Sequence, residues 1–259
     1  MSNKTINTHQ GHWILARMGK KVLRPGGKEL TQKLIHNLNI NAQDDVVEFA
    51  PGLGFTASIT LKSRPRSYTG IELNEEAAAL LRRTINGPQG KIIIGNAADS
   101  TLPGNTFSKV YGEAMLTMQP DYRKSEIIQE AYRILKKGGL YGIHELGLQP
   151  DHISESHKSE IQRELAQSIK VNARPLTQSE WSNLLEKEGF KIIKTEINPM
   201  HLLKTKRIID DEGFYRYLKI MFNIMTHPQE RKSILAMKNV FKKYQNHLNA
   251  ISIIAEKIE

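Results

Sequence analysis

Residues 44–73 constrain the fold of this 259-residue chain more than any other stretch. They read DDVVEFAPGLGFTASITLKSRPRSYTGIEL. An apolar run, 46–49, breaks into a turn with Gly52 and Gly54, and a second apolar run, 68–71, ends at Glu72. This order predicts a strand, a glycine turn, a helix and a second strand that ends in an acid. Such a unit typically binds the adenosine part of a ligand. The ligand can be a dinucleotide, a nucleoside triphosphate or S-adenosylmethionine.

The remaining pattern predicts an α/β fold. Further strands are expected at 91–95, 109–113, 140–146, 191–197 and 250–256. Helices are expected at 54–63, 121–135, 156–170, 211–226 and 228–247, and after the N-caps Asn74 and Thr177. Strands that alternate with helices indicate a mostly parallel sheet covered on both faces, with ligands beyond the carboxyl ends of its strands.

Composition narrows the chemistry. The chain has no cysteine, which excludes disulfides, thiolate metal sites and a cysteine nucleophile. No group of histidines and carboxylates has metal-ligand spacing, so we expect no metal site. The N-terminus lacks a signal-peptide pattern and no apolar run approaches the roughly 18 residues of a spanning helix, so we expect a cytoplasmic protein without a membrane span.

The net charge of +10 is unevenly distributed. Residues 1–33 and 204–243 are strongly basic, and the stretch between them is close to neutral. Such segments suit nucleic acid, an anionic substrate or a lipid surface, although solvated surface lysines explain the same counts.

Two of the three adenosine compounds fit poorly. Residues 52–57 match the dinucleotide pattern G-x-G-x-x-A, and the Tyr132 and Lys136 pair imitates a short-chain dehydrogenase. However, Tyr132 falls on the apolar stripe of its helix and comes early for that family. A triphosphate site needs Gly-Lys-Ser/Thr, but the Gly-Lys pairs here precede Lys, Glu and Ile.

S-adenosylmethionine fits more of the chain. It has no phosphates, so its site needs other partners. A glycine turn lets the backbone come close to the cofactor, and carboxylates can bind its ribose hydroxyls and its ammonium group. Glu72, at the end of the second strand, is placed for the ribose hydroxyls. Glu48, at the end of the first strand, is placed for the ammonium.

From these residues the chain resembles the class I S-adenosylmethionine-dependent methyltransferases. Residues 48–54, EFAPGLG, resemble the first motif of that family, with Ala50 in place of its first glycine. Glu72 matches the second motif, and Gly95-Asn96-Ala97 resembles the third, with Asn96 or Asp99 for the adenine amino group. LKKGG at 135–139 and LLEKEGF at 184–190 resemble two further segments. The resemblance covers roughly 45–197 and the last strand.

The resemblance implies a Rossmann-like seven-stranded sheet whose last strand is antiparallel beside the fifth. It assigns cofactor contacts to Glu48, Ala50, Gly52, Gly54, Glu72, Leu73, Asn96, Ala97 and Glu113. Glu113, His144 and Glu145 lie near the expected methyl position by topology and are the catalytic candidates. Strand alternation would point only one of His144 and Glu145 toward the pocket.

The sequence also suggests a domain division and an acceptor. We expect an N-terminal arm or lid (1–27), a methyltransferase domain (28–197 with 249–259) and a helical insertion (198–248) that covers the acceptor pocket. Phe214, Tyr217, Met221 and Phe222 share one helical face and are expected to face the transferred methyl group. The pattern is closest to small-molecule methyltransferases, including those of quinones and sterol-like compounds, and predicts in-line transfer to a small apolar or aromatic acceptor.

Two alternatives stay open. The first alternative is an RNA methyltransferase. Its basic residues should then form one continuous stripe on the surface: Arg17, Lys20, Lys21, Lys204, Lys206, Arg207, Lys242 and Lys243. A non-catalytic cofactor-binding scaffold would keep the first motif without turnover. The sequence leaves the oligomeric state open.

Overall fold

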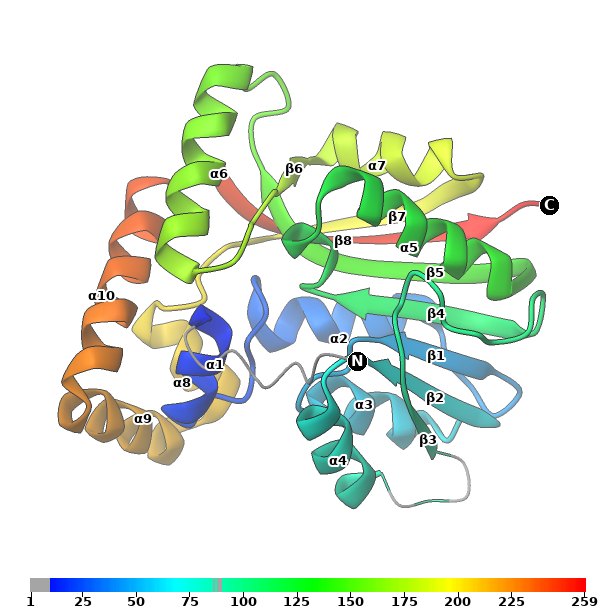
Figure 1. The fold of residues 1–259 in the computed structure, drawn as a ribbon, viewed down its shortest axis with the longest axis horizontal. Helices are drawn as coiled ribbons and strands as arrows, with labels where there is room; N and C mark the ends of the chain where they lie inside the picture. Colours follow the sequence, from blue (N-terminus) through cyan, green and yellow to red (C-terminus); the bar gives the residue numbers. More distant parts are fainter. Residues whose placement is uncertain (1–9, 86, 88–89) are drawn as a thin grey trace.

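A computed structural model describes residues 10–85, 87 and 90–259. Its sheet follows the order β3-β2-β1-β4-β5-β8-β7, and the short β6 pairs with β5 (Figure 1). The strands are β1 (Asp45–Phe49), β2 (Ser67–Glu72), β3 (Gly90–Ile94), β4 (Phe107–Glu113), β5 (Leu135–Leu148), β6 (Leu176–Thr177), β7 (Phe190–Pro199) and β8 (Leu248–Lys257). β8 is antiparallel to both β5 and β7, and the other pairs are parallel. The predicted Rossmann-like architecture is confirmed.

Helices cover both faces of this sheet. They are α1 (Gly11–Arg17), α2 (Gly27–Leu38), α3 (Phe55–Thr60), α4 (Glu75–Thr84), α5 (Asp121–Ile134), α6 (Glu155–Ile169), α7 (Gln178–Lys187), α8 (Thr205–Glu212), α9 (Phe214–Thr226) and α10 (Pro228–Lys243), with short 3-10 turns at Leu61–Ser63 and Leu116–Met118. α5 and α7 pack on one face, and α2, α3 and α4 pack on the other. A third apolar cluster joins α1, α6, α8, α9 and α10 beyond the strand ends.

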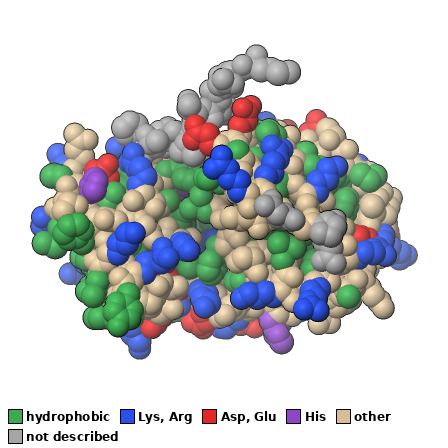
Figure 2. Space-filling view, turned by 90° about the horizontal axis from the view of Figure 1, so that it is seen from below, with side chains coloured by type: hydrophobic (Ala, Val, Ile, Leu, Met, Phe, Trp, Pro, Cys, Tyr) green, Lys and Arg blue, Asp and Glu red, His purple; other side chains and the backbone are tan. Residues whose placement is uncertain are grey.

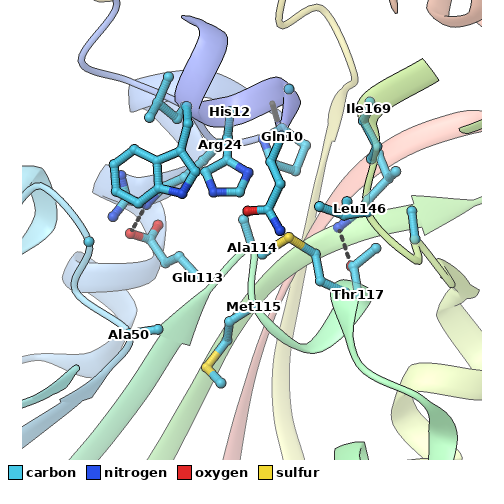
Figure 3. Close-up of a pocket in the computed structure, with 18 of the residues that line it drawn as sticks. Gln10, His12, Arg24, Ala50, Glu113, Ala114, Met115, Thr117, Leu146 and Ile169 are labelled. Carbon is cyan, nitrogen blue, oxygen red and sulfur yellow. Dashed lines mark hydrogen bonds and ion pairs between the residues drawn. The ribbon is translucent and has the colours of Figure 1, made fainter. Parts of the chain in front are cut away.

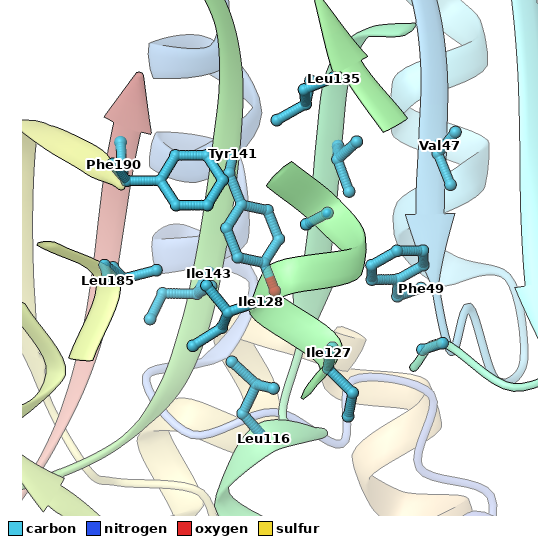
Figure 4. Packing of buried hydrophobic residues seen from close by; sticks show 14 of the residues in the cluster. Val47, Phe49, Leu116, Ile127, Ile128, Leu135, Tyr141, Ile143, Leu185 and Phe190 are labelled. Carbon is cyan, nitrogen blue, oxygen red and sulfur yellow. The ribbon is translucent and has the colours of Figure 1, made fainter. Parts of the chain in front are cut away.

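The core under α5 fixes the strands that carry the site. Ile127 and Ile128 of α5 pack against β1 and β5, and Tyr141 stacks near Phe190 with ring centroids 5.4 Å apart (Figure 4). These side chains are almost completely buried. Burial on this scale stabilises by roughly 1.5–3 kcal/mol per large side chain, so the carboxyl ends of β1, β4 and β5 are firmly positioned.

Several local predictions are confirmed. The side chain of Asn74 caps α4 by accepting from the Ala77 amide, and Thr177 and Glu180 form a capping box at α7. Each device satisfies backbone donors that a helix start leaves free.

One local prediction is wrong, and one helix was not predicted. The segment 211–226 is not one helix, because Gly213 adopts φ +82° and ends α8 before α9 begins. Residues 11–17 form α1, which the polar N-terminal sequence did not indicate. The break at Gly213 is local, whereas α1 depends on packing: its Ile14 and Leu15 join the third apolar cluster, which no local pattern encodes.

Within the described residues, no helix combines the length and the apolar character that crossing a bilayer requires.

Candidate active site

The glycine turn after β1 has a left-handed backbone at three positions. Ala50, Gly52 and Gly54 have φ angles of +52°, +59° and +77°. Ala50 is held there by a 2.9 Å hydrogen bond from its amide to the Ile71 carbonyl. A Cβ on Gly54 would lie 2.7 Å from Leu81, whereas a Cβ on Gly52 would meet only the Ala50 carbonyl, at 4.0 Å. The backbone at Gly52 is therefore open to close approach by a ligand.

Glu72 ties this turn to the end of β2. Its carboxylate accepts from the Gly52 amide at 3.0 Å and from the Asn74 amide at 2.9 Å. Burial raises the pKa of Glu72, and the backbone donors of Asn74 and Gly52 oppose that rise. Each carboxylate oxygen keeps a second lone pair, which can accept from a hydroxyl of a ligand.

A cavity of about 620 Å³ starts at this turn. Its volume lies within the roughly 300–1,000 Å³ of small-molecule sites. The predicted residues that line it are Ala50, Gly52, Glu72, Leu73 and Glu113. Its other walls come from the N-terminal arm, the end of β4, the segment 169–173 and the helical segment after β7.

The cavity has a polar end and an apolar end. Ala50 and Glu113 lie at one side, Leu146 and Ile169 lie at the other, and Gln10 and His12 project between them (Figure 3). The apolar end is completed by Ile169, Val171, Ala173, Met200, Leu202, Met237 and Phe241.

Glu113 is the centre of a buried polar cluster at the end of β4. It accepts from Thr31 Oγ1 at 2.7 Å and from the Thr56 hydroxyl, and it contacts Arg24 Nε at 2.5 Å and His144 Nδ1 at 2.7 Å. Burial alone would raise the pKa of Glu113, but Arg24 and His144 outweigh burial and lower it to about 2. Glu113 is therefore a carboxylate that joins the N-terminal arm to the sheet.

His144 does not fit the role of a base. Its Nε2 lies 2.6 Å from the Pro25 carbonyl, which can only accept, and its Nδ1 faces the Glu113 carboxylate. Both nitrogens therefore face acceptor groups of the protein itself, and neither points toward a substrate in the cavity. The side chain is fully buried and is absent from the cavity lining.

Glu145 is also committed to structure. Its carboxylate accepts from the amides of Met115, Leu116 and Thr117 and from the Thr117 hydroxyl, at 2.7–3.0 Å. It shapes the loop after β4 and does not line the cavity. In this structure His144 and Glu145 therefore bond to other parts of the protein and lie outside the cavity lining, so their geometry does not support the predicted catalytic role.

Four predicted cofactor contacts lie outside the cavity lining: Glu48, Gly54, Asn96 and Ala97. Glu48 points into the sheet, where the hydroxyls of Tyr68 and Tyr111 donate to it at 2.6 and 2.7 Å. Burial raises the pKa of Glu48 to about 7, against the effect of these hydrogen bonds. Asn96 accepts from the Ala98 amide at 3.0 Å, which shapes its own loop.

The prediction for the first insertion helix is wrong. Phe214, Tyr217, Met221 and Phe222 do not line the cavity. The apolar cover comes from Met237 and Phe241 of α10 and from Met200 and Leu202 after β7. Helical periodicity identified an apolar face on α9 but could not say that its buried residue is Ile220.

The sequence predicted an N-terminal arm over the site, with Trp13 in it, but did not single out Gln10 or His12 as lining residues. Gln10, His12 and Trp13 line the cavity, and burial lowers the pKa of His12 to about 4. Its imidazole is therefore neutral at pH 7, and among the described residues no hydrogen-bond partner of its nitrogens is observed. The sequence feature that could have indicated this wall is a histidine beside a tryptophan in an otherwise polar arm.

Known proteins share this sequence pattern. A family profile described as "Methyltransferase domain" matches residues 46–139, which include the glycine turn, Glu72 and Glu113. An uncharacterised methyltransferase of Synechocystis is 27% identical over 141 residues, covering 54% of this chain and 65% of the relative. Residues 46–139 are therefore a class I S-adenosylmethionine-dependent methyltransferase domain. The methyltransferase is also 35% identical over 251 residues to an uncharacterised protein of Haemophilus influenzae, covering 95% of this chain and 98% of that one.

Solved structures agree with the fold of the methyltransferase. Phosphoethanolamine N-methyltransferase 2 of Haemonchus contortus, in complex with S-adenosyl-L-methionine, superposes with a TM-score of 0.74 at 16% identity. The match covers 99% of this chain and 59% of that one. The cofactor of the methyltransferase is S-adenosyl-L-methionine, and the open backbone at Gly52 beside the Glu72 carboxylate fits it.

Proposed function

We propose that this methyltransferase transfers a methyl group to a small apolar acceptor that carries a hydroxyl. One observation supports this most: a single cavity joins the glycine turn to a wall of aliphatic, Met and Phe side chains. Apolar lining with few polar groups is typical of sites for small organic ligands. The methyl position would then lie between the two ends of the cavity.

The cofactor, when bound, supplies an activated methyl group on a sulfonium. The chain positions its parts: Glu72 would accept from the ribose hydroxyls, and Gly52 would allow the backbone to approach. Leu73 and Ala50 would flank the same end. Because such a displacement needs collinear atoms, positioning is the main contribution of the protein to rate.

His12 is the proposed general base. Its neutral imidazole projects between the two ends of the cavity and can accept the proton that a hydroxyl acceptor loses. No such role is open to Glu113, since its carboxylate is saturated by Arg24, His144 and two threonines.

The arm and the insertion would act as covers. Residues 10–25 of the arm supply one wall, and residues 200–241 of the insertion supply another. The arm is tied to the insertion because Glu212 accepts from the amides of Lys21 and Val22 at 2.7 and 2.8 Å. These contacts support an ordered wall more than a free lid.

Three of the basic residues expected of an RNA enzyme are paired with acids. Lys20 is buried near Asp211 and Glu212, Arg207 pairs with Glu29, and Arg17 pairs with Glu230. Charges that are buried or paired contribute little to phosphate binding. This arrangement favours the small-molecule acceptor over RNA.

Transfer from methyl-labelled S-adenosylmethionine to a panel of apolar phenols, apolar amines and total tRNA tests the proposal. We expect label in the phenols, with kcat lowered at least 100-fold by His12→Gln and unchanged by His36→Gln on the exposed side of α2. The affinity for S-adenosylhomocysteine should stay within twofold in both variants.

Other results would contradict specific parts of this proposal. Transfer to tRNA alone would show that the acceptor is RNA and not a small molecule. If His12→Gln does not slow transfer to phenols, His12 is not the general base, although the acceptor class is still supported. Tight cofactor binding without transfer to any compound in the panel would favour a scaffold.

A further inference from the structure

The outer face of α9 is a row of exposed apolar side chains. Phe214, Tyr215, Leu218, Phe222 and Met225 are 56%, 89%, 47%, 66% and 67% exposed. At 100° per residue they span about 100° of the helix surface, so they form one continuous stripe, called here the α9 stripe. Large exposed apolar side chains are normally scattered, and a contiguous row marks an interaction surface.

The fold holds this stripe outward. On the opposite side of α9, Ile220 is buried in the third apolar cluster, and Asn223 donates to the Met18 carbonyl at 3.0 Å. These contacts fix the rotation of the helix. The stripe is therefore not a core face that lost its partner, because the core face of α9 is already occupied.

The charge around the stripe is mostly positive. Residues 213–238 contain five Lys or Arg residues and a single acid, Glu230, which pairs with Arg17 at 3.5 Å. α9 itself contains no Asp or Glu. Lys219, Arg231 and Lys232 are exposed, and in the part of the chain that the structure describes they form no ion pair. Figure 2, which views the molecule from below, shows hydrophobic side chains gathered at the end that holds α9, with Lys and Arg side chains beside them.

We propose that the α9 stripe binds an anionic lipid bilayer, with its apolar side chains in the interface and Lys219, Arg231 and Lys232 at the headgroups. A helix with bulky apolar residues on one face and cations at its border lies in the plane of a membrane interface. Each cation near an anionic surface strengthens this attraction, which salt weakens.

The same observations disfavour a second copy of the chain. Most homodimers are two-fold symmetric, so each stripe would face its own copy. The bordering cations of both copies would then lie close together, and α9 contains no acid to pair them. A bilayer containing phosphatidylglycerol supplies the missing negative charge.

Vesicle co-sedimentation of the full chain tests this surface. We expect binding to phosphatidylglycerol vesicles at low salt, weak binding to phosphatidylcholine vesicles, and at least tenfold weaker binding to the anionic vesicles in Leu218→Ser/Phe222→Ser. The matched control is Leu80→Ser/Tyr122→Ser, because Leu80 and Tyr122 are 47% and 68% exposed and lie away from α9. This control should bind as the wild type does.

A charge variant separates the two contributions. Lys219→Gln/Arg231→Gln/Lys232→Gln should lose the preference for anionic vesicles and most of the salt dependence. The proposal is overturned if wild type ignores both kinds of vesicle, or if the stripe variant binds like its control. It is also overturned if sedimentation velocity shows a dimer that the stripe variant abolishes. None of these readouts uses methyl transfer, so they do not depend on the acceptor.

Discussion

Arg24 Nε lies 2.5 Å from Glu113 Oε2, and this ion pair joins the N-terminal arm to the carboxyl end of β4. Both side chains are almost completely excluded from solvent. Pro25, the next residue, accepts from His144, so the arm contacts the same cluster twice. The N-terminal wall of the cavity thus depends on a pair that is 89 residues apart in the sequence.

Removing the arginine should destabilise the fold. Arg24→Gln leaves a buried carboxylate with a lost partner, which costs about 3 kcal/mol of unfolding free energy. Urea denaturation followed by circular dichroism measures this cost. Arg66→Gln, which breaks the exposed pair with Asp45, should leave the midpoint nearly unchanged. Equal losses in the two variants would mean that the Arg24 pair is not buried in solution.

Glu48 should make stability fall as pH rises. Its folded pKa of about 7 exceeds its ordinary value of 4.5, so the fold favours the protonated carboxyl. This stabilisation is present below pH 4.5 and is lost between pH 4.5 and 7, by on the order of 3 kcal/mol. Glu48→Gln, which cannot ionise, should therefore gain stability relative to wild type between pH 5 and pH 8.

The effect of Glu48 is measured as the difference in stability between the variants and the wild type. Thermal unfolding of wild type, Glu48→Gln and the exposed control Glu76→Gln at both pH values gives the required shifts. A Glu48→Gln curve parallel to that of wild type would show that Glu48 is ionised in the fold at pH 5.

Ala50 carries backbone strain at the cofactor turn. Its φ of +52° costs an alanine roughly 1–2 kcal/mol, which a glycine does not incur. After the larger unfolded-state entropy of glycine is subtracted, Ala50→Gly should stabilise by up to about 1 kcal/mol. Ala79→Gly, at an exposed position inside α4, should instead destabilise by about 1 kcal/mol. Differential scanning calorimetry that found both variants destabilised equally would argue against the left-handed turn.

Glu72 should dominate cofactor affinity. In Glu72→Ala the ribose would lose its charged acceptor and the turn would lose its bond to Gly52. Loss of hydrogen bonds to a charged group costs about 1.5–3 kcal/mol, or roughly tenfold or more in Kd for S-adenosylhomocysteine. Calorimetric titration measures this change, with Glu76→Ala on the exposed side of α4 as control. An unchanged Kd in Glu72→Ala would place the ribose elsewhere.

The sequence alone determined the sheet and the cofactor turn, because their signals are local. The apolar runs of the strands, the glycines at 52 and 54 and the acid at 72 each express a constraint within a few residues. The same locality explains the correct caps at Asn74 and Thr177.

Only the tertiary structure decided which side chains face the cavity. His144 and Glu145 lie on β5, beside Glu113 at the end of β4. However, the polar atoms of His144 contact Pro25, and those of Glu145 accept from residues 115–117, which are distant in the sequence. His12 reaches the cavity because α1 packs on α10. A sequence pattern fixes the face of a helix on which a residue lies, whereas burial of that face depends on which other elements pack against it.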